Sequence, residues 1–168
     1  MAEPTRCTTE VEVRYAETDQ MGVVHHANYV VWFELARTRL CAMSGYRYAD
    51  IERLGYQLMV TAVEIRYRRP ARYGDTVGVV CWGERLASRG VRFAYEVLRG
   101  ADLLATGATE HVWVETATGR FCRTPAPLRA PFERLAGIDD TSNSGAGGVQ
   151  QAGSGTGSAG PRVKERDR

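Results

Sequence analysis

The sequence lacks the cysteine patterns that mark zinc-binding and disulfide-rich proteins. Its four cysteines are Cys7, Cys41, Cys81 and Cys122, and none of them belongs to a C-x-x-C pair. Scattered single cysteines predict neither a zinc site nor a disulfide framework. We therefore expect no metal site, and no other motif requires an organic cofactor.

Long apolar runs and a strong charge of one sign are also missing. The opening MAEPTRCTTEVEV has no apolar run of signal-peptide length, and no segment of the chain approaches the length of a membrane span. The formal net charge of the 168 residues is only +2, which is too small to indicate a nucleic-acid partner. These absences predict a cytoplasmic protein with no membrane span and no nucleic-acid partner.

Apolar side chains are almost absent from residue 137 onward. Gly, Ser, Ala, Thr and Gln dominate there, before the charged end PRVKERDR. This composition predicts a disordered tail over residues 137–168, and a solvated tail is favoured over a partner-binding one. At 168 residues the chain is long enough for one domain with a proper core, which we expect over residues 1–136.

A long helix is the strongest pattern in the remaining sequence. From Asn28 to about Met43 there is no glycine or proline, and apolar residues lie on nearly every side of the first two turns. Such a helix must be wrapped by other elements. Its first backbone N–H groups point into the preceding loop, where a carbonyl oxygen or an anion can accept from them.

The loop before this helix contains a carboxylate. Gly22 permits the bend that returns Asp19 towards the helix start. A carboxylate beside an amide that polarises a carbonyl is an arrangement suited to acyl-group chemistry. A turn-capping role for Asp19 is the alternative.

Alternating apolar and polar residues predict five strands around the helix. Their expected ranges are 9–16, 57–69, 76–84, 91–98 and 103–115, with a short helical connection in YRYADIERLGY and a short amphipathic segment ending near Leu135. This order indicates an α+β layout with one sheet on one helix. Because one open sheet cannot cover every side of the helix, we expect a second copy of the molecule to act as a lid.

Several runs of residues carry a resemblance to a known family. They are Y-x-E-T-D-x-x-G-V-V-x-H-x-N-Y from Tyr15, F-E-x-A-R from Phe33, YRRPARYGD from Tyr67 and HVWV from His111. Over residues 9 to 135 they resemble the hotdog-fold acyl-CoA thioesterases of the 4-hydroxybenzoyl-CoA thioesterase type. The resemblance implies a hotdog fold, in which a five-stranded antiparallel sheet wraps around one long central helix. It also implies a homodimer joined through the sheets, or a homotetramer.

The resemblance implies two catalytic groups. It places the catalytic carboxylate at Asp19 and the carbonyl-polarising backbone N–H at His26. Asp19 could activate a water as a general base or attack the thioester directly, and both routes stay open. Because a thiolate leaves readily, the main demand is to stabilise the oxyanion, which an amide at a helix N-terminus does.

Other residues are expected to contact the substrate. Gly22, Tyr29 and Glu34 are expected to line its pocket, although an ion pair between Glu34 and Arg37 is an equal alternative. His111, which lies in a predicted strand, is expected to be a structural histidine held by hydrogen bonds.

Positive charge is needed for the phosphates of coenzyme A. Arg89 and Arg92, near the turn at 86–90, are the candidates. The alternative is an ordinary solvated face, and Gly90 stands where the family often has a small polar residue.

The predicted function is hydrolysis of an acyl-CoA thioester to the free acid and coenzyme A. The first alternative is a thioesterase acting on an acyl carrier protein in a polyketide or other biosynthetic pathway; its enediyne-type members carry Asn where Asp19 stands. A hotdog dehydratase is disfavoured by the tight spacing of Asp19 and His26. A non-catalytic acyl-binding hotdog protein is disfavoured by the intact Asp19 and Gly22.

Overall fold

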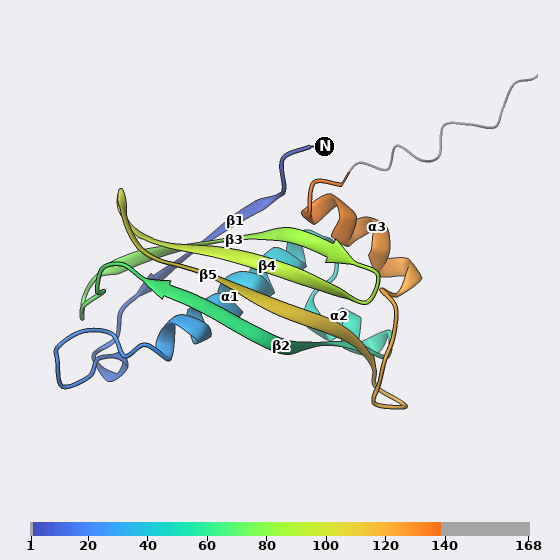
Figure 1. Cartoon of the computed structure of the whole chain (residues 1–168), viewed down its shortest axis with the longest axis horizontal. Helices are drawn as coiled ribbons and strands as arrows, with labels where there is room; N and C mark the ends of the chain where they lie inside the picture. The colour runs from blue at the N-terminus through green and yellow to red at the C-terminus, as the bar shows by residue number, and fades with distance from the viewer. Residues whose placement is uncertain (1, 139–168) are drawn as a thin grey trace, which may run out of the picture.

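The computed structural model describes residues 2–138, which form one curved antiparallel sheet with three helices. The strands follow the order β1-β3-β4-β5-β2, and a short β6 pairs with β5 (Figure 1). Their bounds are β1 (Arg6–Glu12), β2 (Tyr56–Tyr67), β3 (Thr76–Ala87), β4 (Gly90–Arg99), β5 (Asp102–Glu115) and β6 (Arg120–Phe121). The two edges of the main sheet are therefore β1 and β2.

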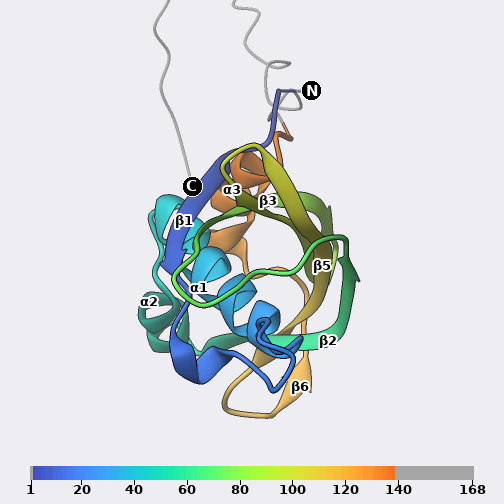
Figure 2. The ribbon, with the colours of Figure 1, turned by 90° about the vertical axis from the view of Figure 1, so that its left-hand side faces the viewer.

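The central helix lies inside the curve of the sheet. Figure 2 shows the strands passing around α1 (Asn28–Met43), whereas α2 (Tyr48–Arg53) lies outside the ring of strands. The third helix, α3 (Ala126–Leu135), joins the same core as α1, and its Phe132 ring meets the Trp113 ring of β5 edge to face with the centroids 5.2 Å apart. On α1, the side chains of Trp32 and Phe33 are 0% exposed. Burial of side chains of this size stabilises the fold by about 1.5–3 kcal/mol each.

The helix approaches the sheet closely at one point. The ring of Phe33 stacks on that of Tyr95 with 4.1 Å between the centroids. Beside them, a Cβ atom on Gly107 of β5 would lie 2.5 Å from the Phe33 ring. Glycine at this strand position therefore permits the close contact of α1 with β5.

The structure confirms the predicted hotdog fold, with its antiparallel sheet around a long helix. The helix begins and ends at the predicted residues. The strands predicted at 57–69, 76–84, 91–98 and 103–115 are present, with their ends shifted by a few residues. The two-residue strand β6 was not predicted.

The prediction of a strand over 9–16 is wrong in its second half. β1 ends at Glu12, and Tyr15–Glu17 form a 3-10 turn. The Glu17 carboxylate accepts the Arg14 N–H at 2.8 Å, so this backbone group is engaged locally and not in the strand ladder. The backbone therefore turns away from the sheet earlier than the alternation of residues indicated.

The two ends of the described chain pack against each other. The Thr5 N–H donates to the Leu135 carbonyl at 3.1 Å, and Gly137 is buried beside Ala2. Of the predicted tail over 137–168, the part from residue 139 lies outside the described residues. Within residues 2–138, no helix has both the length and the hydropathy that a membrane crossing requires.

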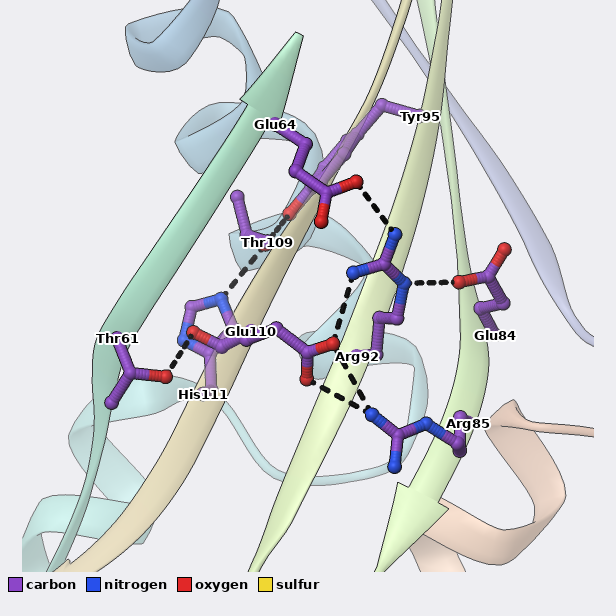
Figure 3. Close-up of polar contacts among 9 residues, drawn as sticks. All are labelled: Thr61, Glu64, Glu84, Arg85, Arg92, Tyr95, Thr109, Glu110 and His111. Carbon is purple, nitrogen blue, oxygen red and sulfur yellow. Dashed lines mark hydrogen bonds and ion pairs between the residues drawn. The ribbon is translucent and has the colours of Figure 1, made fainter.

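A network of polar side chains crosses the core between α1 and β5. Arg37 is 8% exposed and His111 is 2% exposed. The Arg37 guanidinium donates to the Tyr48 hydroxyl at 2.9 Å and lies 3.3 Å from His111 Nε2. Thr109 Oγ1 lies 2.8 Å from the same ring nitrogen and 2.8 Å from the Tyr95 hydroxyl (Figure 3). Because a guanidinium can only donate, Nε2 is an acceptor and the His111 ring is neutral.

The neutral ring makes the stability of the fold depend on pH. Burial, together with the neighbouring Arg37 charge, lowers the pKa of His111 from 6.5 to about 3. Between these two values the unfolded chain binds a proton that the folded chain does not bind. The contribution of His111 is therefore complete above the unfolded pKa and is lost progressively as the pH falls below it.

We expect His111 to remove about 2 kcal/mol of unfolding free energy when the pH falls from about 7.5 to about 5. The His111→Gln variant should lack this component, so its stability should fall less than that of the wild type. Urea denaturation at the two pH values measures the difference, with His25→Gln, at an exposed histidine, as the control. The same pH dependence in His111→Gln and wild type would contradict a buried neutral imidazole.

Candidate active site

The loop between β1 and α1 holds Asp19 in a tight turn. The Asp19 N–H donates to the Val23 carbonyl at 2.9 Å, and the Gly22 N–H donates to the Asp19 carbonyl at 2.9 Å. The turn is closed by Gly22, whose φ of 71° is left-handed and favours glycine. The Asp19 carboxylate accepts the Met21 N–H at 2.8 Å through Oδ1, so it does cap the turn. Among residues 2–138 nothing donates to its second oxygen, which is left for other chemistry.

The start of α1 is tied to the same loop. The His25 N–H donates to the Glu17 carbonyl at 2.8 Å, and the Ala27 N–H lies 3.3 Å from the His25 ring nitrogen Nδ1, which accepts from it. Between these two, the His26 N–H has no acceptor in the part of the chain that the structure describes. This donor stands two residues before Asn28, the first residue of α1, where the positive end of the helix dipole adds to it.

Asp19 and His26 line one cavity of about 320 Å³. Its wall is formed by the loop, the first turn of α1 and the end of β2. The lining residues are Asp19, Met21, Val23, Val24, His26, Tyr29, Tyr67, Arg68, Arg69 and Pro70. The cavity therefore combines a carboxylate and an unengaged amide with an apolar wall of the kind that small-molecule sites have.

Two tyrosines fix the floor of this cavity. The Tyr67 hydroxyl donates to the His26 carbonyl at 3.0 Å, and the Tyr29 hydroxyl accepts the Ala71 N–H at 3.3 Å. The two rings meet edge to face with centroids 5.1 Å apart. Burial raises the pKa of Tyr29, which keeps its hydroxyl protonated. Tyr67 thus joins the end of β2 to the helix start.

Glu34 does not reach this cavity within one chain. It lies on the exposed side of α1, beside Val31 and Leu35, which are 48% and 49% exposed. It forms no ion pair with Arg37 or any other residue in 2–138. Of the predicted pocket residues, the structure therefore brings together Asp19, His26 and Tyr29, with Gly22 in the supporting turn.

The two predicted coenzyme A arginines also lie away from Asp19. Arg92 is on the sheet face opposite α1, where it pairs with Glu64, Glu84 and Glu110 (Figure 3). The hydrogen bonds that Arg92 donates to these three carboxylates raise its pKa, and their charge already compensates that of the guanidinium. Arg89 is exposed in the turn between β3 and β4.

A hollow of about 700 Å³ surrounds Arg92. Although it is larger than the cavity at Asp19, its two carboxylates, Glu64 and Glu84, both already accept hydrogen bonds from Arg92. The other charged lining residue is Arg66. The smaller cavity has a carboxylate and an amide that lack such partners. It is therefore the better candidate for chemistry.

This chain matches the model of a protein family over a range that includes the cavity. Residues 13–132 match the model of the thioesterase-like superfamily, and this range contains every residue that lines the cavity and every strand of the sheet except β1. The chain belongs to the thioesterase-like superfamily.

Relatives of this thioesterase-like chain include named and solved proteins. It is 42% identical over 107 residues to the "Putative acyl-CoA thioesterase YneP" of Bacillus subtilis, covering 63% of this chain and 78% of that protein. A hypothetical protein from Thermus thermophilus superposes with a TM-score of 0.73 at 37% identity, covering 78% of this chain and 98% of its own. A DHNA-CoA thioesterase from Staphylococcus aureus superposes with a TM-score of 0.73 at 32% identity, and the match covers 77% of this chain and 90% of that protein.

The sequence analysis did not identify the roles of two residues at or beside the cavity. Tyr67 and Glu17 both lie in the runs that carry the family resemblance, but neither was assigned a role there. Tyr67 faces the cavity only because β2 ends opposite the start of α1. The alternation of residues gave no signal for Glu17, because it does not show that this carboxylate accepts the Arg14 N–H and so helps to end the strand.

Gly22→Ala should lower the unfolding free energy by about 1 kcal/mol, because alanine is strained at a left-handed φ. The space itself is sufficient, since the nearest heavy atom to an added Cβ is Arg72 Nη1 at 3.9 Å. Gly78→Ala is a matched control with an ordinary backbone, where the Cβ would meet Thr8 Cγ2 at 3.4 Å. Thermal and urea unfolding compare the two variants, and an equal loss in both would contradict strain at Gly22.

Proposed function

We propose that the chain hydrolyses acyl-CoA thioesters to the free acid and coenzyme A at the cavity around Asp19. As a member of the superfamily it is a thioester hydrolase, and its relatives carry the names of acyl-CoA thioesterases. The observation that carries the proposal is the pairing of a carboxylate that has one uncommitted oxygen with an unengaged His26 N–H in one cavity.

The proposed reaction uses the two groups on opposite sides of the thioester carbonyl. The His26 N–H donates to the carbonyl oxygen and stabilises the negative charge that forms there as the carbon becomes tetrahedral. Asp19 either removes a proton from an attacking water or attacks the carbon itself, giving an anhydride that water then opens. In both routes the C–S bond breaks, and coenzyme A leaves as a thiolate that takes up a proton.

The apolar wall of the cavity supports an acyl group as the bound part of the substrate. Val24 and Tyr29 are 5% and 2% exposed and lie beside the carboxylate. Assignment to the 4-hydroxybenzoyl-CoA thioesterase type rests on the run from Tyr15 to Tyr29 and is part of this proposal. The proposal also includes one catalytic domain over residues 1–136, a tail over residues 137–168 and a cytoplasmic location.

We also propose that the chain acts as a dimer joined through β2. This edge strand exposes Met59, Val60 and Val63 by 43% each and Tyr67 by 49%, and it has no partner on its outer side in the described chain. An unpaired apolar edge is prone to pair with another strand. A two-fold axis through the middle of β2 would extend the sheet into a second copy.

The dimer gives Arg89 a place in the site. The Arg89 carbonyl accepts the Trp113 N–H at 2.9 Å, and Trp113 is paired with Leu58, so Arg89 lies at the Tyr56 end of β2. The cavity lies at the Tyr67 end, roughly 30 Å away along the strand. Antiparallel pairing of two β2 strands brings opposite ends together, so the partner's Arg89 would lie near the cavity and could meet coenzyme A phosphates.

Asp19→Asn should lower kcat for acyl-CoA hydrolysis by at least about 100-fold and change KM little, because the amide is neither a base nor a nucleophile. A panel of acyl-CoAs with release of free thiol as the readout measures this, and Asp50→Asn, remote from the cavity on α2, is the control. Equal rates in wild type and Asp19→Asn on every substrate would remove the proposed role of Asp19.

Val63→Lys should convert the dimer to a monomer, because it places a charge on the apolar edge where two copies would meet. Val31→Lys, on the outward side of α1, should leave the β2 dimer intact and would reduce a tetramer to a dimer if α1 forms the second contact. Sedimentation velocity at micromolar concentration distinguishes these states. A monomeric wild type would contradict the proposed dimer.

A further inference from the structure

Glu17 is a buried carboxylate that the proposed chemistry does not use. Its side chain is 5% exposed and receives hydrogen bonds from three donors. Oε2 accepts the Arg14 N–H at 2.8 Å, and Oε1 accepts from the Arg14 guanidinium at 3.1 Å and from Trp32 Nε1 at 3.1 Å. Since an unpaired buried charge is costly, the three bonds explain how this carboxylate can remain ionised.

The protonation state of Glu17 is set by the same contacts. Burial alone would raise its pKa, but the hydrogen bonds from Arg14 and Trp32 outweigh this effect and hold the pKa below its ordinary value. The group is therefore an anion at neutral pH and accepts all three bonds. Trp32 itself is 0% exposed on α1, so the carboxylate is anchored to the rigid centre of the fold.

The backbone of Glu17 makes a second set of contacts. Its carbonyl accepts the His25 N–H at 2.8 Å and the side-chain amide of Asn28 at 2.8 Å. Immediately afterwards, Thr18 forms a β-bridge with Val24. One residue thus binds the part of the loop that carries Asp19 to the segment that leads into α1.

We propose that Glu17 is the positioning residue that sets the distance between the Asp19 carboxylate and the His26 N–H. Asp19 follows it by two positions, and His26 follows the residue whose N–H Glu17 accepts. Its side chain fixes the first of these segments against Trp32, and its carbonyl fixes the second. The inference rests on the proposed function, because the distance matters only if the two groups act together.

This geometry has a direct consequence for the rate. A displacement of about 1 Å between reacting groups can cost about 100-fold in rate. Loss of the Glu17 contacts should therefore reduce turnover more than it reduces folding. A residue that supports only the fold would instead lower the fraction of folded protein and leave the kcat of the folded molecules unchanged.

The test compares Glu17→Gln with Glu12→Gln, an exposed glutamate on β1. Glutamine has the same shape, but its NH₂ group must face one of the three donors, so one contact becomes repulsive. For acyl-CoA hydrolysis we expect kcat, corrected for folded fraction, to fall about 10- to 100-fold in Glu17→Gln with KM changed less than about threefold. The control Glu12→Gln should match wild type.

A second variant tests the route through the helix. Trp32→Phe keeps an aromatic side chain but removes the five-membered part of the indole with the N–H that donates to Glu17, so it should lower kcat in the same direction by a smaller factor. The double variant should be no slower than Glu17→Gln alone, because both changes break one connection. Fully additive losses, or a corrected kcat equal to wild type in Glu17→Gln, would overturn the proposal.

Amide hydrogen exchange gives a readout that is independent of catalysis. The His25 N–H, bonded to the Glu17 carbonyl, should exchange at least about tenfold faster in Glu17→Gln than in wild type, and equally in Glu12→Gln. Unchanged exchange would overturn the positioning role even if hydrolysis is slowed. If wild type hydrolyses no acyl-CoA, the proposed function fails, while faster exchange in Glu17→Gln would still support the connection between the loop and the helix.

Discussion

The contact of α1 with the inner face of the sheet is the constraint on which the other features depend. Phe33 stacks on Tyr95, and Gly107 leaves the space that the ring requires. A helix held at this depth has little freedom to slide, because side chains in a close-packed core occupy defined positions. The position of its first turn is then fixed relative to the end of β2. The cavity with Asp19 and His26 forms where those two ends meet, so the core packing decides the location of the site.

The charged side chains buried in the fold have more complete hydrogen bonding than the carboxylate at the candidate site. Arg37 and Glu17 are both buried, and each is surrounded by hydrogen-bonding partners that fix its protonation state. Asp19 is half-buried and keeps an oxygen without a donor among residues 2–138. A group whose bonds are complete holds its neighbours in place, whereas a group with a remaining lone pair can act on a substrate. In the proposed function, this contrast separates the residues that position from the residue that reacts.

The sequence was most informative where a local pattern decides the structure. The helix from Asn28 to Met43 has no breaking residue and was predicted with its observed bounds. The first strand was predicted too long, because the side chain of Glu17 binds a backbone N–H that the alternation could not reveal. Tyr67 and the carboxylates around Arg92 come from segments distant in sequence, so their roles depend on the strand order β1-β3-β4-β5-β2, which no local pattern specifies. Motif spacing brought Asp19 and His26 together, but only the folded chain showed which N–H lacks an acceptor.

The open cavity and the unpaired edge of the sheet share residues. Tyr67 lines the cavity, binds the His26 carbonyl and is 49% exposed at the end of β2. Any partner that covers this strand end also removes water from the cavity. In a drier site the hydrogen bond from the His26 N–H to a developing oxyanion is stronger, because less solvent competes and screens it. The exposed edge, which is unfavourable for a lone chain, would therefore link the proposed dimer to the electrostatics that the proposed hydrolysis requires.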